Sequence, residues 1–255
     1  MSSGIVMRRT DDLLSVEEFR AALHRIGEER YHHKHPFHLL MHEGKLSKGA
    51  LQAWALNRYY YQSRIPIKDA LILSRCDDPE FRRAWRIRLI DHDGNNNSEG
   101  GLERWLCLAE ATGLARDRVI GCEEVLPAVR YAVDAYLHLV KTRSLLEAVA
   151  SSLTELFSRE LISLRVGALR EHYPWLSAGL TYFEARLDQA PRDADFAFAF
   201  VAGHAHNRVL QEAAIRALRD KCDILWAQLD ALYYAYVDPA CPPPGAFLPG
   251  NDSSA

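Results

Sequence analysis

The chain has 255 residues, of which 48% are hydrophobic and 25% charged, and its formal net charge is −3. These values are typical of a soluble globular protein, and they exclude binding to nucleic acid or to an anionic membrane through bulk charge. The sequence contains no apolar run of about 20 residues, the length of a membrane span, and its N-terminus lacks the apolar stretch of a signal peptide. We therefore expect a cytoplasmic protein that binds neither nucleic acid nor membrane.

The number and spacing of the cysteines are typical of a protein in a reducing compartment. Their number is odd and no two of them form a C-x-x-C pair, so neither a disulfide framework nor a zinc site is expected. We expect free thiols at Cys76, Cys107, Cys122, Cys222 and Cys241.

The first third of the chain begins with a polar, aperiodic segment, residues 1–14, which we expect to be loose. Ser15 and Glu18 then form a capping box that begins a helix. A histidine-rich stretch follows, in which Pro36 fits the first turn of a short helix and Gly44 its end.

The next helix carries residues 56–69, LNRYYYQSRIPIKD. Pro66 predicts a kink or a new helix start there. Arg58 and Gln62 are four residues apart and share a helix face, and Lys68 follows just beyond the proline. Two cations, an amide and a row of tyrosines near a bend suit a planar anionic ligand. The alternative is a solvated helix face with tyrosines packed against the core.

Further along, Asp78 and Pro79 are typical of an N-cap and first helical residue, and Gly94 of the helix end. The polar residues 95–101 predict a loop, and residues 102–112 a helix.

The second half of the chain is also helical in pattern. Pro127 begins a long helix, and residues 144–169 predict about seven further turns, either continuous or interrupted near Ser158. A turn at Pro191 separates two more helices, and residues 208–237 form a long amphipathic one.

The fold class predicted from these patterns is all-α, because no segment alternates as a strand does. Short connections favour a single compact antiparallel bundle over residues 15–237. The Pro- and Gly-rich residues 238–255 predict a tail that wraps the surface or is disordered.

Polar side chains recur within the apolar helices. Arg88 and His92 are four residues apart near a helix C-terminus, where the helix dipole favours a cation and should raise the basicity of the histidine. His92 is thus a candidate general base facing a cavity, or part of a solvated helix end. Tyr182 and Arg186 have the same spacing. Polar residues on at least five helices indicate a polar cavity inside the bundle; other members of this set are Tyr31, His32, Tyr136, Thr154, Glu155 and Lys221.

The histidines also raise a metal hypothesis. Glu29 and His32 have the Glu-x-x-His spacing of helical di-iron proteins, but the second copy that such a site requires is missing. No feature selects a haem ligand. A metal- or haem-dependent oxidase therefore stays only an alternative.

Longer strings are more specific than any of these pairs. The chain resembles the pyrroloquinoline-quinone (PQQ) synthase family in the segments YHHKHPFH, NRYYYQSRIPIKDA, RLIDHDG, YAVDAYLHLV, SSLTELF, HYPW and KCDILWAQLDA. They occur in the family's order and cover about residues 15–237.

The resemblance implies a haem-oxygenase-like bundle that forms a homodimer. It also implies the last step of PQQ biosynthesis, in which a ring-open tricarboxylate quinone is closed and oxidised by eight electrons. Oxygen is the acceptor, hydrogen peroxide is released and PQQ is the product. The family uses neither a metal nor an organic redox cofactor.

The resemblance also assigns roles to residues. His92 would transfer protons, and Tyr182 and Arg186 would face the oxygen. The cations for the substrate carboxylates would be Arg58, Lys68, Arg88, Arg165, Arg186 and Lys221. Hydrogen bonds would come from Tyr31, His32, Gln62 and Thr154, while Tyr136 and Glu155 would line the pocket.

One position departs from the family. Ile162 stands where a histidine can occur in the oxygen pocket, and isoleucine donates neither a proton nor a hydrogen bond. A non-catalytic PQQ carrier of the same fold is therefore a second hypothesis. A thiaminase-like hydrolase is disfavoured, because it needs a cysteine nucleophile beside a carboxylate pair and the cysteines lie in apolar or unremarkable contexts.

Overall fold

The computed structural model describes residues 13–250, so most of the segment expected to be loose lies outside the described residues. The all-α prediction is confirmed: apart from one isolated bridge between Asn95 and Ser98, residues 13–250 contain no β-structure. The α-helices are α1 (Val16–Arg30), α2 (Pro36–His42), α3 (Lys48–Leu73), α4 (Pro79–Asp93), α5 (Gly101–Ala111), α6 (Arg116–Gly121), α7 (Pro127–Thr142), α8 (Leu145–Ala150), α9 (Ser158–His172), α10 (Thr181–His204) and α11 (Arg208–Tyr236), and the 3₁₀ helices are η1 (His32–Lys34), η2 (Ser151–Phe157) and η3 (Pro174–Gly179).

Local sequence signals set several of these boundaries. Ser15 Oγ accepts a hydrogen bond from the Glu18 backbone N–H at 3.2 Å and completes the predicted capping box of α1. Asp78 accepts one from the Glu80 N–H at 2.8 Å at the start of α4. At the other end of α4, Gly94 has φ +81°, a conformation that glycine adopts at little cost.

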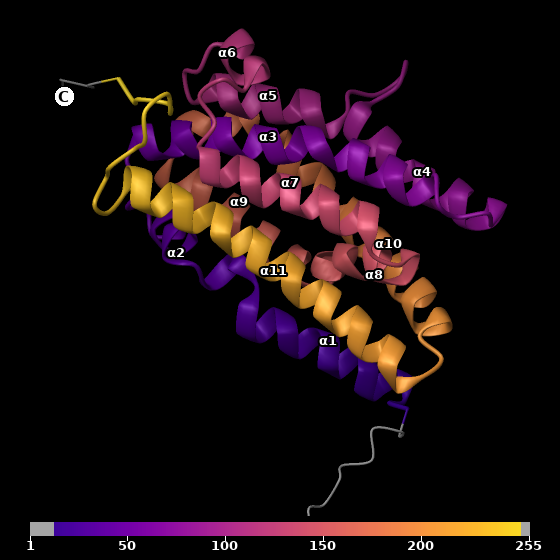
Figure 1. The fold of residues 1–255 in the computed structure, drawn as a ribbon. Coiled ribbons are helices and arrows are strands. Elements are labelled where there is room, and N and C mark those ends of the chain that lie inside the picture. Colours follow the sequence, from indigo (N-terminus) through magenta and orange to yellow (C-terminus); the bar gives the residue numbers. More distant parts are fainter. Residues whose placement is uncertain (1–12, 251–255) are drawn as a thin grey trace, which may run out of the picture.

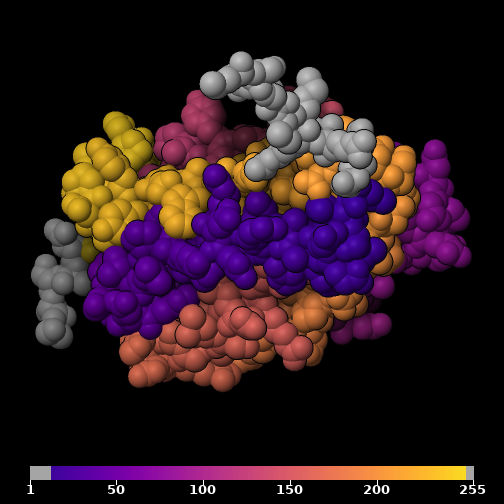
Figure 2. All heavy atoms as spheres, turned by 90° about the horizontal axis from the view of Figure 1, so that it is seen from below, coloured from indigo at the N-terminus to yellow at the C-terminus, as the bar shows by residue number. Residues whose placement is uncertain are grey.

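The helices pack in layers around a shared interior. Helices α3, α7 and α11 lie side by side, with α5 against α3 and α1 along α11 (Figure 1). Helices α8, α9 and α10 and the 3₁₀ helix η2 pack behind them. On the face seen in Figure 2, the segment from α1 to α2 runs between α11 and α9.

Helix α3 corrects one of the two alternatives predicted at Pro66, because no new helix starts there. It is continuous from Lys48 to Leu73 with the proline inside it. Proline removes one backbone hydrogen bond, but buried residues on both sides of it, Ile65 and Ile72 among them, hold the helix in the core. As a result, the polar residues before and after Pro66 face one interior region.

Helix α10 corrects a second prediction, since Pro191 lies inside it and not in a turn. Of the two alternatives for residues 144–169, the interruption near Ser158 occurs, as the seven-residue 3₁₀ helix η2 between α8 and α9. Such a run is longer than the usual three or four residues. Helix α6 was not predicted.

The described part of the C-terminal tail wraps the surface. Phe247 is buried, its backbone N–H donates to the Glu124 carbonyl at 3.0 Å, and its carbonyl accepts from the Tyr236 hydroxyl at 3.0 Å. The division into a bundle and two flanking segments stays a prediction.

Two expectations concern the whole bundle. All five cysteines are free, as predicted. None of the helices within residues 13–250 combines the length and the apolar character needed to span a membrane.

Candidate active site

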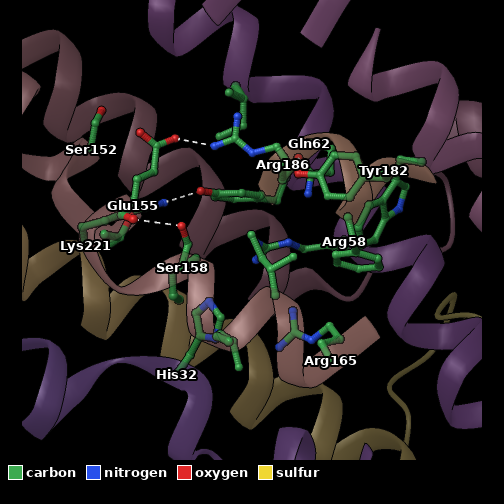
Figure 3. Close-up of a pocket in the computed structure, with 18 of the residues that line it drawn as sticks. His32, Arg58, Gln62, Ser152, Glu155, Ser158, Arg165, Tyr182, Arg186 and Lys221 are labelled. Atoms are coloured by element: carbon green, nitrogen blue, oxygen red, sulfur yellow. Dashed lines mark hydrogen bonds and ion pairs between the residues drawn. The ribbon is translucent and has the colours of Figure 1, made fainter. Parts of the chain in front are cut away.

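The site is a cavity of about 120 Å³ between the helices of the bundle (Figure 3). Helices α2, α3, α4, α5, α7, α9, α10 and α11 contribute side chains to it, together with η2 and the segment between α1 and α2. All the candidate residues predicted from the sequence line this one cavity: Tyr31, His32, Arg58, Gln62, Lys68, Arg88, His92, Tyr136, Thr154, Glu155, Arg165, Tyr182, Arg186 and Lys221.

In one half of the cavity the cations are matched by carboxylates. Asp69, which is fully buried, lies 2.5 Å from Lys68 Nζ and 3.5 Å from Arg88 Nε. The same carboxylate accepts a hydrogen bond from Trp85 Nε1 at 2.9 Å. Lys68 also donates to Ser152 Oγ at 3.3 Å, which ties α3 to η2.

Two further carboxylates complete this half. Glu155 lies 2.8 Å from Arg88 Nη1 and 2.7 Å from Arg186 Nη2. Asp193 Oδ2 lies 3.5 Å from Arg88 and 3.4 Å from Arg186. We call the cations Lys68, Arg88 and Arg186 with the acids Asp69, Glu155 and Asp193 the paired half.

In the other half, the cations Arg58, Arg165 and Lys221 form no ion pair with a carboxylate within residues 13–250. We call these three residues the unpaired half. In Figure 3, Arg58 and Arg165 lie away from the Glu155–Arg186 pair.

Aromatic rings surround two of these unpaired cations. The Arg58 guanidinium lies 4.0 Å from the centre of the Tyr61 ring. Lys221 Nζ donates to the Tyr61 hydroxyl at 2.9 Å and lies 3.4 Å from the centre of the Tyr136 ring. Burial, followed by the positive charge of Arg58, holds the pKa of Lys221 well below its usual range. The charged form of Lys221 is therefore costly in the free cavity, and an incoming anion would stabilise it.

Histidines surround the third unpaired cation. Arg165 Nη2 lies 3.1 Å from His38 Nδ1, and His38 Nδ1 lies 3.2 Å from His32 Nδ1. Burial lowers the pKa of Arg165 to about 10. Burial, followed by the positive charges of Arg58 and Arg165, holds the pKa of His32 well below its usual value. Burial, followed by the charge of Arg165, also holds the pKa of His38 well below its usual value, so both imidazoles are neutral near pH 7.

His92 is buried at the C-terminal end of α4, with Nδ1 3.1 Å from the Arg88 carbonyl oxygen. A carbonyl only accepts, so Nδ1 carries the proton and Nε2 keeps a lone pair. Burial and then the Arg186 charge lower the pKa of His92 to about 4. The expected increase in basicity from the helix dipole was therefore wrong, because desolvation outweighs it. A neutral imidazole is a competent proton acceptor.

Tyr182 and Arg186 lie on one face of α10, as their spacing predicted. The Tyr182 hydroxyl donates to Gln62 Oε1 at 3.0 Å, and its ring stands perpendicular to Trp105 at 4.9 Å between centres. This hydrogen bond fixes the phenol against α3.

Sequence reasoning missed the acids of the paired half other than Glu155. Asp69 directly follows Lys68 in the motif IPIKD and could have been found as its partner. Asp193 was missed because the turn expected at Pro191 placed it on a different helix from Arg186. Ile162 lines the cavity and is buried, so the departure from the family lies inside the site.

The metal hypothesis gains no support from the geometry. Glu29 is exposed while His32 is buried in the cavity wall, so the Glu-x-x-His pair does not converge. Within the described residues, no group of three or more His, Cys, Asp or Glu side chains is arranged to hold a metal ion. The absence of a metal cofactor stays a prediction.

Comparison with known proteins identifies the family. Residues 20–231 match the TENA/THI-4/PQQC family. A pyrroloquinoline-quinone synthase from Acidiphilium cryptum is 59% identical over 241 residues, which cover 94% of this chain and 97% of that protein. The chain belongs to the TENA/THI-4/PQQC family, among its pyrroloquinoline-quinone synthases. The resemblance predicted from the sequence is thereby confirmed.

Other relatives agree. A pyrroloquinoline-quinone synthase from Granulibacter bethesdensis is 53% identical, with 95% of each chain covered. A solved domain of unknown function from Shewanella denitrificans, with a heme oxygenase-like fold, has a TM-score of 0.75 at 12% identity and covers 93% of this chain and 100% of its own. This structural likeness confirms the predicted haem-oxygenase-like bundle.

Proposed function

We propose that this enzyme catalyses the last step of PQQ biosynthesis. In that step a ring-open tricarboxylate quinone closes to the tricyclic product and loses eight electrons, with oxygen as acceptor and hydrogen peroxide released. The family places the chain in PQQ biosynthesis, and the relatives named above are pyrroloquinoline-quinone synthases. The finer chemistry is argued below from the cavity.

The observation that carries the proposal is the unpaired half. Burying a cation without a counter-charge is costly. Arg165 and Lys221 are buried and Arg58 is partly buried, so these three cations around one cavity favour a ligand that brings the missing charge. A substrate with three carboxylates would supply it to Arg58, Arg165 and Lys221. Arginine suits this task because its guanidinium binds a carboxylate through two parallel hydrogen bonds.

The remaining predicted binding residues would orient the substrate. Arg88 Nε has no hydrogen-bond acceptor within the described residues, so Arg88, with Lys68 beside it, would add donors from the paired half. Smaller polar groups would contact the quinone oxygens and ring nitrogens: Tyr31, His32, Gln62 and Thr154. Tyr136 and Glu155 would support these contacts from the cavity wall.

His92 would move protons during ring closure and oxidation. Ring closure releases a proton from the attacking group, and each oxidation removes more. The free Nε2 lone pair of a neutral imidazole is the acceptor that these steps require. Because its pKa is about 4, His92 would readily release any proton that it takes up.

Tyr182 and Arg186 would act on oxygen. An electron-rich substrate intermediate would reduce oxygen directly, so neither a metal nor an organic cofactor is required. A hydroxyl and a guanidinium fixed before the reaction would stabilise the negative charge that develops on superoxide and peroxide. Both groups are already held in place, by Gln62 and by the paired acids.

The size of the cavity implies movement on binding. A volume of about 120 Å³ is below the roughly 300 Å³ at which small-molecule pockets usually begin. The substrate would therefore enlarge the cavity as it enters, and the helices would close again over it to exclude water.

A turnover assay tests the proposal. Chelator-treated enzyme is mixed with the ring-open precursor in air, while quinone absorbance and peroxide are followed together. Formation of PQQ with peroxide is the expected result. Tight binding without oxidation would instead support the carrier hypothesis, which the buried Ile162 favours, and Ile162→His would then be the variant to test for gain of activity. Bound metal or a haem absorption band that tracks activity would support the metal alternative.

Two further expectations from the sequence analysis stay proposals. One is the homodimer, which sedimentation of the purified enzyme would test. The other is a cytoplasmic location, which fractionation of cells would test.

A further inference from the structure

Asp193 is a buried carboxylate of α10 that holds two cavity arginines without lining the cavity itself. Its Oδ2 atom lies 3.4 Å from Arg186 Nη1 and 3.5 Å from Arg88 Nη1. One oxygen atom therefore meets the guanidinium groups of two helices, α4 and α10. Burial raises the pKa of Asp193, but Arg88 and Arg186 more than offset this, so the pKa lies below its usual value and the group is ionised at pH 7.

These two arginines repel each other, and the paired acids separate their charges. Glu155 bridges the same pair from the side of η2, 2.8 Å from Arg88 and 2.7 Å from Arg186. Two cations and two carboxylates thus alternate around a closed ring. Removal of one acid from this ring takes away negative charge between the two arginines, which leaves Asp69 beside Arg88 and the other bridging acid to offset their repulsion.

Asp193 is itself fixed from outside the cavity. Its Oδ1 atom accepts from Arg192 Nη2 at 2.7 Å, and Arg192 also pairs with Asp91 of α4. Asp91 is the neighbour of His92 in sequence. Arg192 thus connects α10 to the part of α4 that carries His92.

We propose that Asp193 is a positioning residue that holds Arg186 and Arg88 in the geometry required for oxygen reduction. The proposal rests on the proposed function, because Arg186 is the group assigned to oxygen. Asp193 contributes a fixed anchor and one negative charge, and it needs no contact with the substrate. Arg186 then faces oxygen with little freedom to turn toward a substrate carboxylate.

Loss of this charge has an unusual signature. In Asp193→Asn the cavity gains one net positive charge, so the anionic product PQQ should bind about tenfold more tightly at low salt. Arg186 loses an anchor, so the kcat/KM for oxygen should fall about tenfold or more. A purely structural role would instead weaken binding and turnover together.

The experiment compares four proteins: wild type, Asp193→Asn, Asp193→Glu and the exposed control Asp195→Asn on the same helix. Absorbance titration with PQQ under nitrogen gives the dissociation constant at two salt concentrations. Oxygen-dependent turnover of the precursor gives kcat/KM for oxygen, and circular dichroism gives the melting temperature. We expect Asp193→Glu to recover part of the turnover and Asp195→Asn to match wild type.

Several outcomes would overturn the positioning role. One is an Asp193→Asn variant with unchanged kcat/KM for oxygen; another is one in which PQQ affinity and turnover fall in the same proportion. If the asparagine variant does not fold, the folded Asp193→Glu variant decides: turnover and affinity both equal to wild type would overturn the role, as would both falling together. Wild-type enzyme that binds PQQ but oxidises nothing would refute the proposed function, while the affinity change in Asp193→Asn would still test the added charge.

Discussion

The two halves of the cavity contain the same number of predicted cations but opposite surroundings. Lys68, Arg88 and Arg186 share three carboxylates, the buried Asp69 and Asp193 and the partly buried Glu155, whereas Arg58, Arg165 and Lys221 lie against aromatic and imidazole rings. In the paired half, charge is balanced before any ligand arrives, so donors are fixed in place. In the unpaired half, the positive charge is balanced only when an anionic ligand binds. The difference separates a region that prepares the chemistry from a region that binds.

The energetic consequences of the two arrangements are also opposite. Removal of one partner from a buried ion pair typically costs about 3–5 kcal/mol, because the other charge is left uncompensated. Removal of a buried cation that has no partner relieves a desolvation cost instead. Substitutions in the two halves should therefore differ in both stability and function.

The largest effect is expected at His92, next to the paired half. His92→Ala should reduce kcat by about 10²- to 10⁴-fold, the usual contribution of general acid–base catalysis, while PQQ affinity stays near that of wild type. Stopped-flow turnover and an anaerobic PQQ titration measure the two quantities. The exposed His204→Ala serves as the control. Unchanged turnover in His92→Ala would remove His92 from its assigned role.

Arg186→Ala should show the next largest effect. Loss of one fixed donor from an oxyanion-stabilising site typically lowers the rate about 10²-fold or more. We expect this loss in the oxygen-dependent steps, and a much smaller one in anaerobic ring closure. Spectra of the precursor under nitrogen, followed by admission of air, separate the two stages. Equal losses in both would mean that Arg186 only binds a carboxylate.

Lys221→Met tests the unpaired half. The variant should weaken PQQ binding about 10- to 100-fold, because a charge-assisted hydrogen bond contributes about 1.5–3 kcal/mol. Its ligand-free form should melt at a higher temperature than wild type, since methionine fills the space without a buried charge. The exposed Lys141→Met is the matched control. A lower melting temperature together with unchanged affinity would contradict the distinction between the halves.

The amino-acid sequence predicted the helices with clear caps, and it did so because their signals are local. Ser15 and Asp78 are the N-caps of α1 and α4, as their motifs indicated. The prolines were misleading where packing dominates: Pro66 and Pro191 both lie inside continuous helices. The cost of one missing hydrogen bond is local, whereas the contacts that hold these helices come from distant parts of the chain.

The candidate site shows the same limit. Helical spacing placed Tyr182 beside Arg186, and the family resemblance brought together the other cavity residues. Neither could show that Asp193 pairs with Arg88, because those residues are more than a hundred positions apart and meet only in the folded chain. The direction of the pKa shift of His92 could not be predicted either. It depends on how deeply the imidazole is buried, and a position at a helix end does not reveal this.

The smallest expected effect is a pH dependence of stability. Burial lowers the pKa of His92 to about 4 and holds those of His32 and His38 well below 6.5. In the unfolded chain these histidines bind protons below pH 6.5, whereas in the fold they stay neutral. Stability is therefore complete above pH 6.5 and is lost as the pH falls toward the folded-state pKa values. For His92 alone the loss between pH 7 and 5.5 should be about 1 kcal/mol.

Bound PQQ should reduce this acid sensitivity, and mainly through one half of the cavity. After burial, the cations of the unpaired half, Arg58 and Arg165, contribute most to the low pKa of His32. Ligand carboxylates that balance those cations should raise it, so protonated His32 becomes less costly in the fold. Melting temperatures measured from pH 7 to 5 should fall less steeply with saturating PQQ than without, and His32→Gln should remove part of that difference. Parallel curves with and without ligand would mean that the carboxylates bind elsewhere than the unpaired half.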